Sequence, residues 1–272
     1  MKIGVMNNPR VSLSDQIIAF GEAEFDFIDL TIEGPAALTP DVKKLKILLE
    51  QFNLSVVGHT DPALPYAYPI AGVRQACLVE LERCARLFHN LGARIMNIHP
   101  CYACPPGMRN EILTLNSEAL VDIQRMAAAH ELTLVLENFV TPFDSVSVFS
   151  LILQQVPGLQ VHLDFGHANL GRDDGVTFCQ FLGQDIKHVH FSDNRGTADH
   201  HMPLGVGNID WLQSVQALQS IGYEGTITLE VFCDDRSMLP QYLEISRQFV
   251  RDLWDKDPPS HKQRFADDKN RL

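Results

Sequence analysis

The chain has 272 residues, with 22 Lys and Arg, 34 Asp and Glu and 11 His, which gives a formal net charge of −12 at pH 7. Hydrophobic residues make up 45% of the chain and charged residues 21%, an ordinary globular composition that excludes disorder and a small disulfide-stapled fold. No apolar run reaches the roughly 18 residues that a membrane span needs. The acidic balance argues against broad nucleic-acid binding, which uses basic patches.

The first residues, MKIGVMNNPR, lack the apolar region of a signal peptide, so we expect a soluble cytoplasmic protein with reduced cysteines. Six cysteines are irregularly spaced along the chain. Cys101 and Cys104 form a CxxC pair without a second pair, which is weak support for a zinc knuckle. We expect them to be two ordinary loop cysteines.

Strand-like and helix-like segments alternate along the chain. The predicted strands are 2–8, 25–33, 54–59, 94–99, 133–139, 159–164, 186–193 and 225–232. The predicted helices are 13–20, 41–52, 74–91, 110–130, 145–155, 175–182, 209–221 and 239–254. Nearly continuous apolar strands suit a parallel sheet covered by helices, and eight such units predict one closed (β/α)8 barrel over residues 1–254.

The structural alternative is an open, doubly wound sheet, which normally carries a glycine-rich phosphate loop after its first strand. Here that turn reads Asn7-Asn8-Pro9-Arg10, so the barrel is favoured. Residues 255–272 are polar and charged, and we expect them to form a peripheral extension.

The predicted strands from the second to the eighth end in side chains that can bind metal or exchange protons. They are Glu33, His59, His99, Glu137, Asp164, His190 and Glu230. In a barrel these ends converge at the C-terminal mouth, where active sites of such barrels lie. Several carboxylates brought together repel one another unless a cation neutralises them. Carboxylates mixed with imidazoles suit Zn²⁺, Mn²⁺, Co²⁺ or Fe²⁺, so the sequence predicts a divalent-metal site.

Spacing within the strands refines this prediction. His188 and His190 are two residues apart and face the same side of their strand, with His190 nearer the mouth. We therefore expect His190 to be the ligand, and His188 and His162 to be packed inside the barrel. His167, three residues after Asp164, can reach the same pocket from the turn.

The loop after the seventh strand, residues 194–211, is long for a connection on the face that carries active sites. Asp199 and His201 are candidates for further ligands, and the alternative is a solvated polar loop. Arg195 is a candidate for holding a phosphate, carboxylate or hydroxyl group of a substrate, and the alternative is a surface arginine.

Four short segments at the strand ends form a recognisable pattern. They are Leu-Glu137-Asn, Leu-Asp164-Phe-Gly-His167, His188-Val-His190-Phe-Ser-Asp-Asn-Arg195 and Leu-Glu230-Val-Phe. It resembles the xylose isomerase-like TIM-barrel superfamily, which contains sugar and sugar-phosphate isomerases and epimerases as well as endonuclease IV. The resemblance runs from about Lys2 to Trp254.

For the epimerase branch, the resemblance implies one divalent metal, with manganese, zinc, cobalt or magnesium as candidates. Its ligands would be Glu137, Asp164, His190 and Glu230. The two glutamates would also act as acid and base on opposite faces of a small sugar, keto-sugar or sugar phosphate, through an enediolate. The residues implied to hold substrate oxygens are His167 and Arg195, and His59, His99 and Glu33 are further candidates.

Endonuclease IV, a trinuclear zinc phosphoesterase that acts on abasic DNA, is the competing branch. Its additional ligand positions look similar to His59, His99, His167, Asp199 and His201, so up to three metals per chain remain open. The chain departs from that enzyme in its first strand turn, after Glu137 and between Asp199 and His201, where His200 replaces a basic residue. The isomerase or epimerase interpretation is therefore favoured.

Two further alternatives stay open. One is a dehydratase or lyase of the superfamily, and the other is a barrel that binds sugar without catalysis. The sequence does not indicate a particular sugar, and homo-oligomerisation through the helices is possible in either case.

Overall fold

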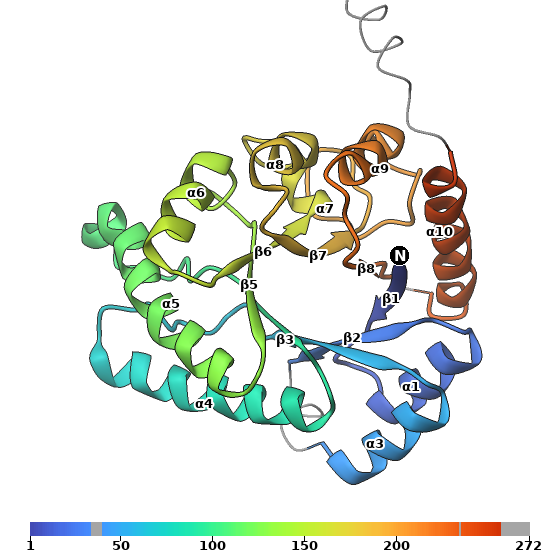
Figure 1. Cartoon of the computed structure of the whole chain (residues 1–272), viewed down its shortest axis with the longest axis horizontal. Coiled ribbons are helices and arrows are strands. Elements are labelled where there is room, and N and C mark those ends of the chain that lie inside the picture. The colour runs from blue at the N-terminus through green and yellow to red at the C-terminus, as the bar shows by residue number, and fades with distance from the viewer. Residues whose placement is uncertain (34–39, 234, 257–272) are drawn as a thin grey trace, which may run out of the picture.

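The computed structural model describes residues 1–33, 40–233 and 235–256, so nearly all of the predicted C-terminal extension lies outside the described residues. Eight parallel strands follow one another round a closed barrel, with helices on the outside (Figure 1). The strands are β1 (Lys2–Met6), β2 (Phe27–Ile32), β3 (Ser55–Thr60), β4 (Ile95–Ile98), β5 (Thr133–Glu137), β6 (Gln160–Asp164), β7 (Ile186–Phe191) and β8 (Thr226–Leu229). The predicted (β/α)8 barrel is confirmed.

Closure of the barrel excludes the open-sheet alternative. β1 pairs with β2 on one side and with β8 on the other, where Ile3 lies opposite Ile227 and Val5 opposite Leu229. Every described strand therefore has two neighbours, which leaves no free edge for another chain to extend.

Apart from the one-turn helix α7 and the segment η1, the helices follow the predicted segments with small shifts at their ends. They are α1 (Leu13–Glu22), α3 (Val42–Gln51), α4 (Ala71–Asn90), α5 (Ile112–Ala129), α6 (Val146–Gln155), α7 (Phe165–Ala168), α8 (Gly175–Leu182), α9 (Trp211–Ser220) and α10 (Leu239–Trp254), with a 3-10 segment η1 (Pro106–Glu111). The side chains of Ser12, Asp174 and Asp210 accept backbone N–H bonds at the starts of α1, α8 and α9. Such caps stabilise a helix by about 0.5–2 kcal/mol each.

Packing between helices and strands explains the apolar faces of both. On α4, Leu81 and Phe88 are fully buried, and burying each side chain is worth about 1.5–3 kcal/mol. Gly58 on β3 lets Phe88 approach, because a Cβ atom at that position would come within 2.4 Å of the ring. None of the described helices is long and apolar enough to cross a membrane.

The inner side of the barrel is polar near its C-terminal mouth. The register places Glu137 beside His162, and Asp164 beside His190. Side chains alternate along a strand, so the intervening Leu163 and Val189 point outward and join the buried apolar core. The same alternation brings the predicted ligands to a common interior.

The one-turn helix α7 replaces the turn expected after β6. Asp164 caps it, and its Oδ1 accepts a hydrogen bond from the His167 backbone N–H at 2.7 Å. This short helix fixes the position of His167 relative to Asp164.

Candidate metal and acid–base site

The four predicted principal ligands gather at the mouth of the barrel. Ligand atoms of Glu137, Asp164 and His190 all lie within 4.8 Å of one another. Glu230 joins them, because its Oε2 lies 3.0 Å from His190 Nδ1. All four residues are buried. We call these four residues the central cluster.

His59 and His99, which the sequence suggests as additional ligands, lie beside the central cluster. His99 Nε2 is 3.1 Å from Glu137 Oε2, and His59 Nε2 is 3.9 Å from the same oxygen. The three residues form a second group whose ligand atoms lie within 4.8 Å of one another. Glu137 therefore belongs to both groups.

The loop after β7 also reaches the site. Asp199 Oδ2 lies 3.2 Å from His167 Nε2 and 3.3 Å from His201 Nε2, and His201 Nε2 lies 3.3 Å from Glu230 Oε1. Asp199 and His201 are thus directed toward the other candidate ligands, while residues 195–200 of the loop are exposed.

Two predicted substrate-binding residues lie apart from these contacts. Arg195 is exposed, and no ion pair of its guanidinium with a described carboxylate is observed. Glu33 is half-buried just beyond β2, and its Oε1 accepts a hydrogen bond from Thr31 Oγ1 at 2.7 Å. β2 contributes Asp29 to the barrel interior instead, where it contacts His188 and His190.

The carboxylates of the central cluster have displaced pKa values. Burial by itself raises the pKa of Glu137, but the nearby His162 and His99 outweigh it and hold that pKa well below its usual value. Burial of Glu230 is outweighed in the same way by His201 and His190, which lower its pKa. For Asp164 burial prevails, and its pKa is raised. The two glutamates are therefore ionised at neutral pH.

Neighbouring imidazoles balance the negative charge of these carboxylates. Burial lowers the pKa of His190, but Glu230 and its other carboxylate partners raise it well above its ordinary value. Burial also lowers the pKa of His201, but Glu230 outweighs it and raises that pKa to about 9. A divalent cation bound by the same carboxylates would replace the positive charge of these imidazoles.

Several buried polar atoms at the site have no hydrogen-bond partner. They are Asp29 Oδ1, Asn97 Oδ1, His99 Nδ1 and His162 Nε2. Buried polar groups are nearly always paired, so unpaired atoms in a mixed set of imidazole and carboxylate donors fit a site that binds an ion or water. The residues present therefore suit a divalent metal of the zinc or manganese type.

A family model described as a xylose isomerase-like TIM barrel matches residues 19–253. The chain belongs to this family. The resemblance found in the strand-end motifs is therefore confirmed.

Relatives within the family give the enzyme class. Fructoselysine 3-epimerase of Escherichia coli O157:H7 is 23% identical over 252 residues, which covers 85% of this chain and 90% of that protein. The crystal structure of a D-tagatose 3-epimerase-like protein superposes with a TM-score of 0.77 at 27% identity and covers 92% of this chain and 100% of that one. The expectation of an enzyme of the sugar isomerase and epimerase kind is confirmed by these relatives.

A further solved structure shares the fold. The IolI protein, whose crystal structure has a binding zinc atom, superposes with a TM-score of 0.79 at 16% identity, covering 93% of this chain and 98% of that one. At this identity the match confirms the barrel alone.

Several polar residues that connect the strands at the barrel mouth are not among the residues predicted from the sequence. Asn97 Nδ2 donates to Glu137 Oε2 at 2.6 Å. Asn138 ties β5 to β6, since its Nδ2 donates to the Asp164 carbonyl and its Oδ1 accepts from the Asp164 N–H. Asp29 stands within the buried strand FIDLTI, and a charged residue inside an otherwise apolar strand was the signal that could have identified it.

The predictions for His162 and His188 are consistent with the structure. Both residues are fully buried inside the barrel, and His188 bonds Asp29 and Thr226. Cys101 and Cys104 are unpaired and make local contacts with backbone carbonyls, as expected for loop cysteines. No group of potential metal ligands among the described residues includes a cysteine.

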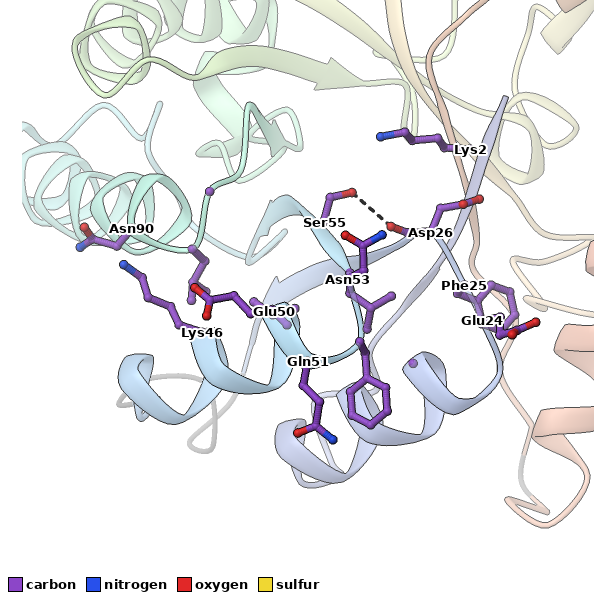
Figure 2. Close-up of a pocket in the computed structure, with 16 residues that line it drawn as sticks. Lys2, Glu24, Phe25, Asp26, Lys46, Glu50, Gln51, Asn53, Ser55 and Asn90 are labelled. Atoms are coloured by element: carbon purple, nitrogen blue, oxygen red, sulfur yellow. Dashed lines mark hydrogen bonds between the residues drawn. The ribbon is translucent and has the colours of Figure 1, made fainter.

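A large cavity lies at the opposite end of the barrel from the site. It has a volume of about 870 Å³ and is lined by the start of β1, the loop between α1 and β2, the end of α3 with the loop that leads to β3, and the end of α4 (Figure 2). Lys2, Asp26, Asn53 and Ser55 line it, and Ser55 Oγ donates to the Asp26 carbonyl (Figure 2). None of the residues lining it is a histidine, so it is not the candidate catalytic site.

Proposed function

We propose that the chain is a divalent-metal-dependent epimerase or isomerase of a small sugar, keto-sugar or sugar phosphate. The observation that carries the proposal is the central cluster, in which two glutamates flank Asp164 and His190 at the C-terminal mouth of the barrel. Catalytic residues of such barrels come from the C-terminal ends of several strands. The similarity to fructoselysine 3-epimerase and to a D-tagatose 3-epimerase-like protein supports it.

In the proposed site, Glu137, Asp164, His190 and Glu230 hold one metal ion, with manganese, zinc, cobalt or magnesium as candidates. A bound divalent ion would polarise a ketone or the adjacent hydroxyl of the substrate and so acidify the proton on the neighbouring carbon. Ligation of a divalent ion favours the charged form of both glutamates, in agreement with their lowered pKa values.

Glu137 and Glu230 act as the acid–base pair. They stand on β5 and just after β8, which are three strands apart in the eight-stranded barrel, so they approach a central substrate from different sides. One glutamate takes the proton from one face of the carbon, and the other, after taking up a proton from solvent or from a substrate hydroxyl, delivers that proton to the opposite face, which inverts the carbon. Return of the proton to the neighbouring carbon isomerises the sugar instead.

Neighbouring side chains orient the carboxylate of each glutamate for proton transfer. Asn97 donates to Glu137, while Glu230 contacts His190 and His201. Hydrogen bonds that hold a carboxylate in one orientation favour proton transfer, because the base is already aligned with the carbon. His167 and His99, at the edge of the cluster, are placed to contact substrate oxygens.

A second candidate function is a trinuclear zinc phosphoesterase of the endonuclease IV type. The observation in its favour is the position of His59, His99, His167, Asp199 and His201, all of which approach the central cluster or one another. The net charge of −12 is unfavourable for a DNA substrate. Incision of abasic duplex DNA that is lost on substitution of Asp199 or His201 would favour this second function.

The test of the proposal is solvent exchange at carbon. Protein prepared without chelator is incubated in D₂O with a panel of ketoses and their phosphates, with and without metal removal. We expect deuterium to enter the carbon beside the carbonyl only with the metal-loaded protein. Exchange that persists after complete metal removal would refute the metal dependence, and no exchange with any member of the panel would refute the proposed substrate class.

A further inference from the structure

A buried carboxylate lies directly beneath the central cluster. Asp29, in the middle of β2, is fully buried. Its Oδ2 lies 2.9 Å from His188 Nε2 and 2.8 Å from His190 Nε2, and it accepts a hydrogen bond from Thr228 Oγ1 at 2.8 Å. A charge so deep in a protein is costly unless it is paired and hydrogen-bonded, and these three donors supply that pairing.

The contact with Asp29 fixes which nitrogen of His190 faces the ligands. Nε2 points inward to Asp29, while Nδ1 lies 3.0 Å from Glu230 Oε2 and 3.7 Å from Asp164 Oδ2. The ring therefore presents Nδ1 to the carboxylates of the central cluster. Rotation of the ring to present Nε2 would break the bond to Asp29.

We propose that Asp29 is a positioning residue that keeps the proton of His190 on Nε2 and leaves the Nδ1 lone pair free for the metal. This inference rests on the metal site of the proposed function and deepens it. A histidine that binds metal through one nitrogen usually donates its other N–H to a carboxylate or carbonyl, which orients the ring and makes the ligand more basic. The pair of Asp29 and His190 has that geometry.

The surroundings of Asp29 hold it in place for this role. His188 bonds Asp29 through Nε2 and Thr226 Oγ1 through Nδ1, the latter at 2.6 Å. Thr228 lies beside His190 in the register of β7 and β8. The partners of Asp29 come from β7 and β8, whereas Asp29 itself stands on β2, and β1 lies between β8 and β2. These contacts therefore cross the barrel interior.

The experiment compares zinc affinity in three variants, using competition with a chromophoric chelator. Asp29→Ala removes the acceptor, and Asp29→Asn keeps an oxygen acceptor but loses the charge. Thr228→Val is the matched control, because it removes one buried donor to Asp29 while leaving the bond between Asp29 and His190. We expect Asp29→Ala to weaken zinc binding by about 10–100-fold, the usual effect of removing such a partner. Asp29→Asn should restore part of the affinity, and Thr228→Val should stay close to the original protein.

A second measurement on the unsubstituted, zinc-loaded protein keeps the test independent of how the variants fold. Long-range ¹H–¹⁵N correlation spectra, with the His190 signals identified by their loss in His190→Gln, report which ring nitrogen carries the proton. We expect a slowly exchanging proton on Nε2 and zinc on Nδ1. A proton on Nδ1 would overturn the inference, as would an equal loss of zinc affinity in Thr228→Val and Asp29→Ala.

The outcomes also separate this inference from the proposed function. If the unsubstituted protein binds no metal, the proposed function fails together with the inference. If it binds metal but Asp29→Ala binds zinc equally tightly, only the role of Asp29 is refuted.

Discussion

Asp193 links the barrel to the loop that carries Asp199 and His201, and Asp193→Asn tests that link. The carboxylate of Asp193 is fully buried at the end of β7. Its Oδ1 accepts from the N–H groups of Asn194 (2.9 Å) and Ile209 (3.4 Å), and its Oδ2 accepts from Gly205 N–H (2.9 Å) and Trp211 Nε1 (3.0 Å). One side chain thus fastens both ends of the loop.

The magnitude follows from these four contacts. In Asp193→Asn one oxygen becomes an NH₂ group, which faces N–H donors and cannot accept from them. In the less costly orientation of the new amide group, the hydrogen bonds from the Asn194 N–H and the more distant Ile209 N–H are lost. Hydrogen bonds to charged groups are worth about 1.5–3 kcal/mol each, so we expect a loss of about 3 kcal/mol. For a chain of this size that corresponds to a fall in melting temperature of about 6–12 °C.

The assay is thermal unfolding followed by circular dichroism, combined with limited proteolysis of the loop. Asp210→Asn is the matched control. Asp210 caps α9 from an exposed position, and its Oδ1 accepts from Gln213 N–H at 3.0 Å, a role that asparagine performs equally well. We expect cleavage between β7 and α9 in Asp193→Asn alone. A melting temperature within about 2 °C of the original, a difference of roughly 1 kcal/mol, would refute the structural role of Asp193.

Three further predictions concern the chemistry of the site. Glu230→Gln should keep the fold and bind metal but lower exchange of the substrate proton with solvent by about 10²–10⁴-fold. The control, Glu131→Gln at an exposed position, should exchange the proton at the original rate. Unchanged exchange in Glu230→Gln would show that Glu230 is not part of the acid–base pair. Metal binding should release protons at pH 7, because the pKa of His201 is raised to about 9 and that of His190 is raised too, so both are protonated before the metal arrives. The apparent affinity for the metal should therefore rise with pH up to about 9. Titration calorimetry in buffers of different ionisation enthalpy measures the protons released, and no release would contradict this charge balance. His201→Asn should retain about one metal per chain by elemental analysis, since it leaves the central cluster intact, and complete loss of metal would show that the loop is needed for the first ion.

The fold was predictable from sequence because its determinants are local. Each strand is a short apolar run, and each helix has a periodic apolar face, so strands such as 133–137 and helices such as 239–254 were anticipated nearly to the residue. Closure then followed from eight repeats of the unit. The one-turn helix α7 was missed because four residues are too few to show helical periodicity.

Much of the site was also predictable, since ligand-type residues at successive strand ends must converge in a parallel barrel. The structure brings Glu137, Asp164, His190 and Glu230 together as that rule requires. Asp29 was missed because it lies inside β2, and Glu33 was predicted because it ends the expected strand 25–33, whereas β2 ends at Ile32. Which of two acidic residues four positions apart enters the interior depends on where the strand ends, and strand ends are poorly defined by sequence.

The net charge now has a structural interpretation. Glu137, Asp164 and Glu230, together with Asp29, place part of the acidic total inside the barrel, where imidazoles balance it. The bound metal of the proposed function would take over part of that balance, so the working protein should be less negative than its sequence.

The most direct test of the central claim is the metal content of the protein purified without chelator, measured by elemental analysis and expressed per chain. The account predicts about one tightly held divalent ion, lost when His190 and Glu230 are substituted together. About three ions per chain would favour the phosphoesterase alternative. No stoichiometric metal, in protein that remains folded, would contradict the account.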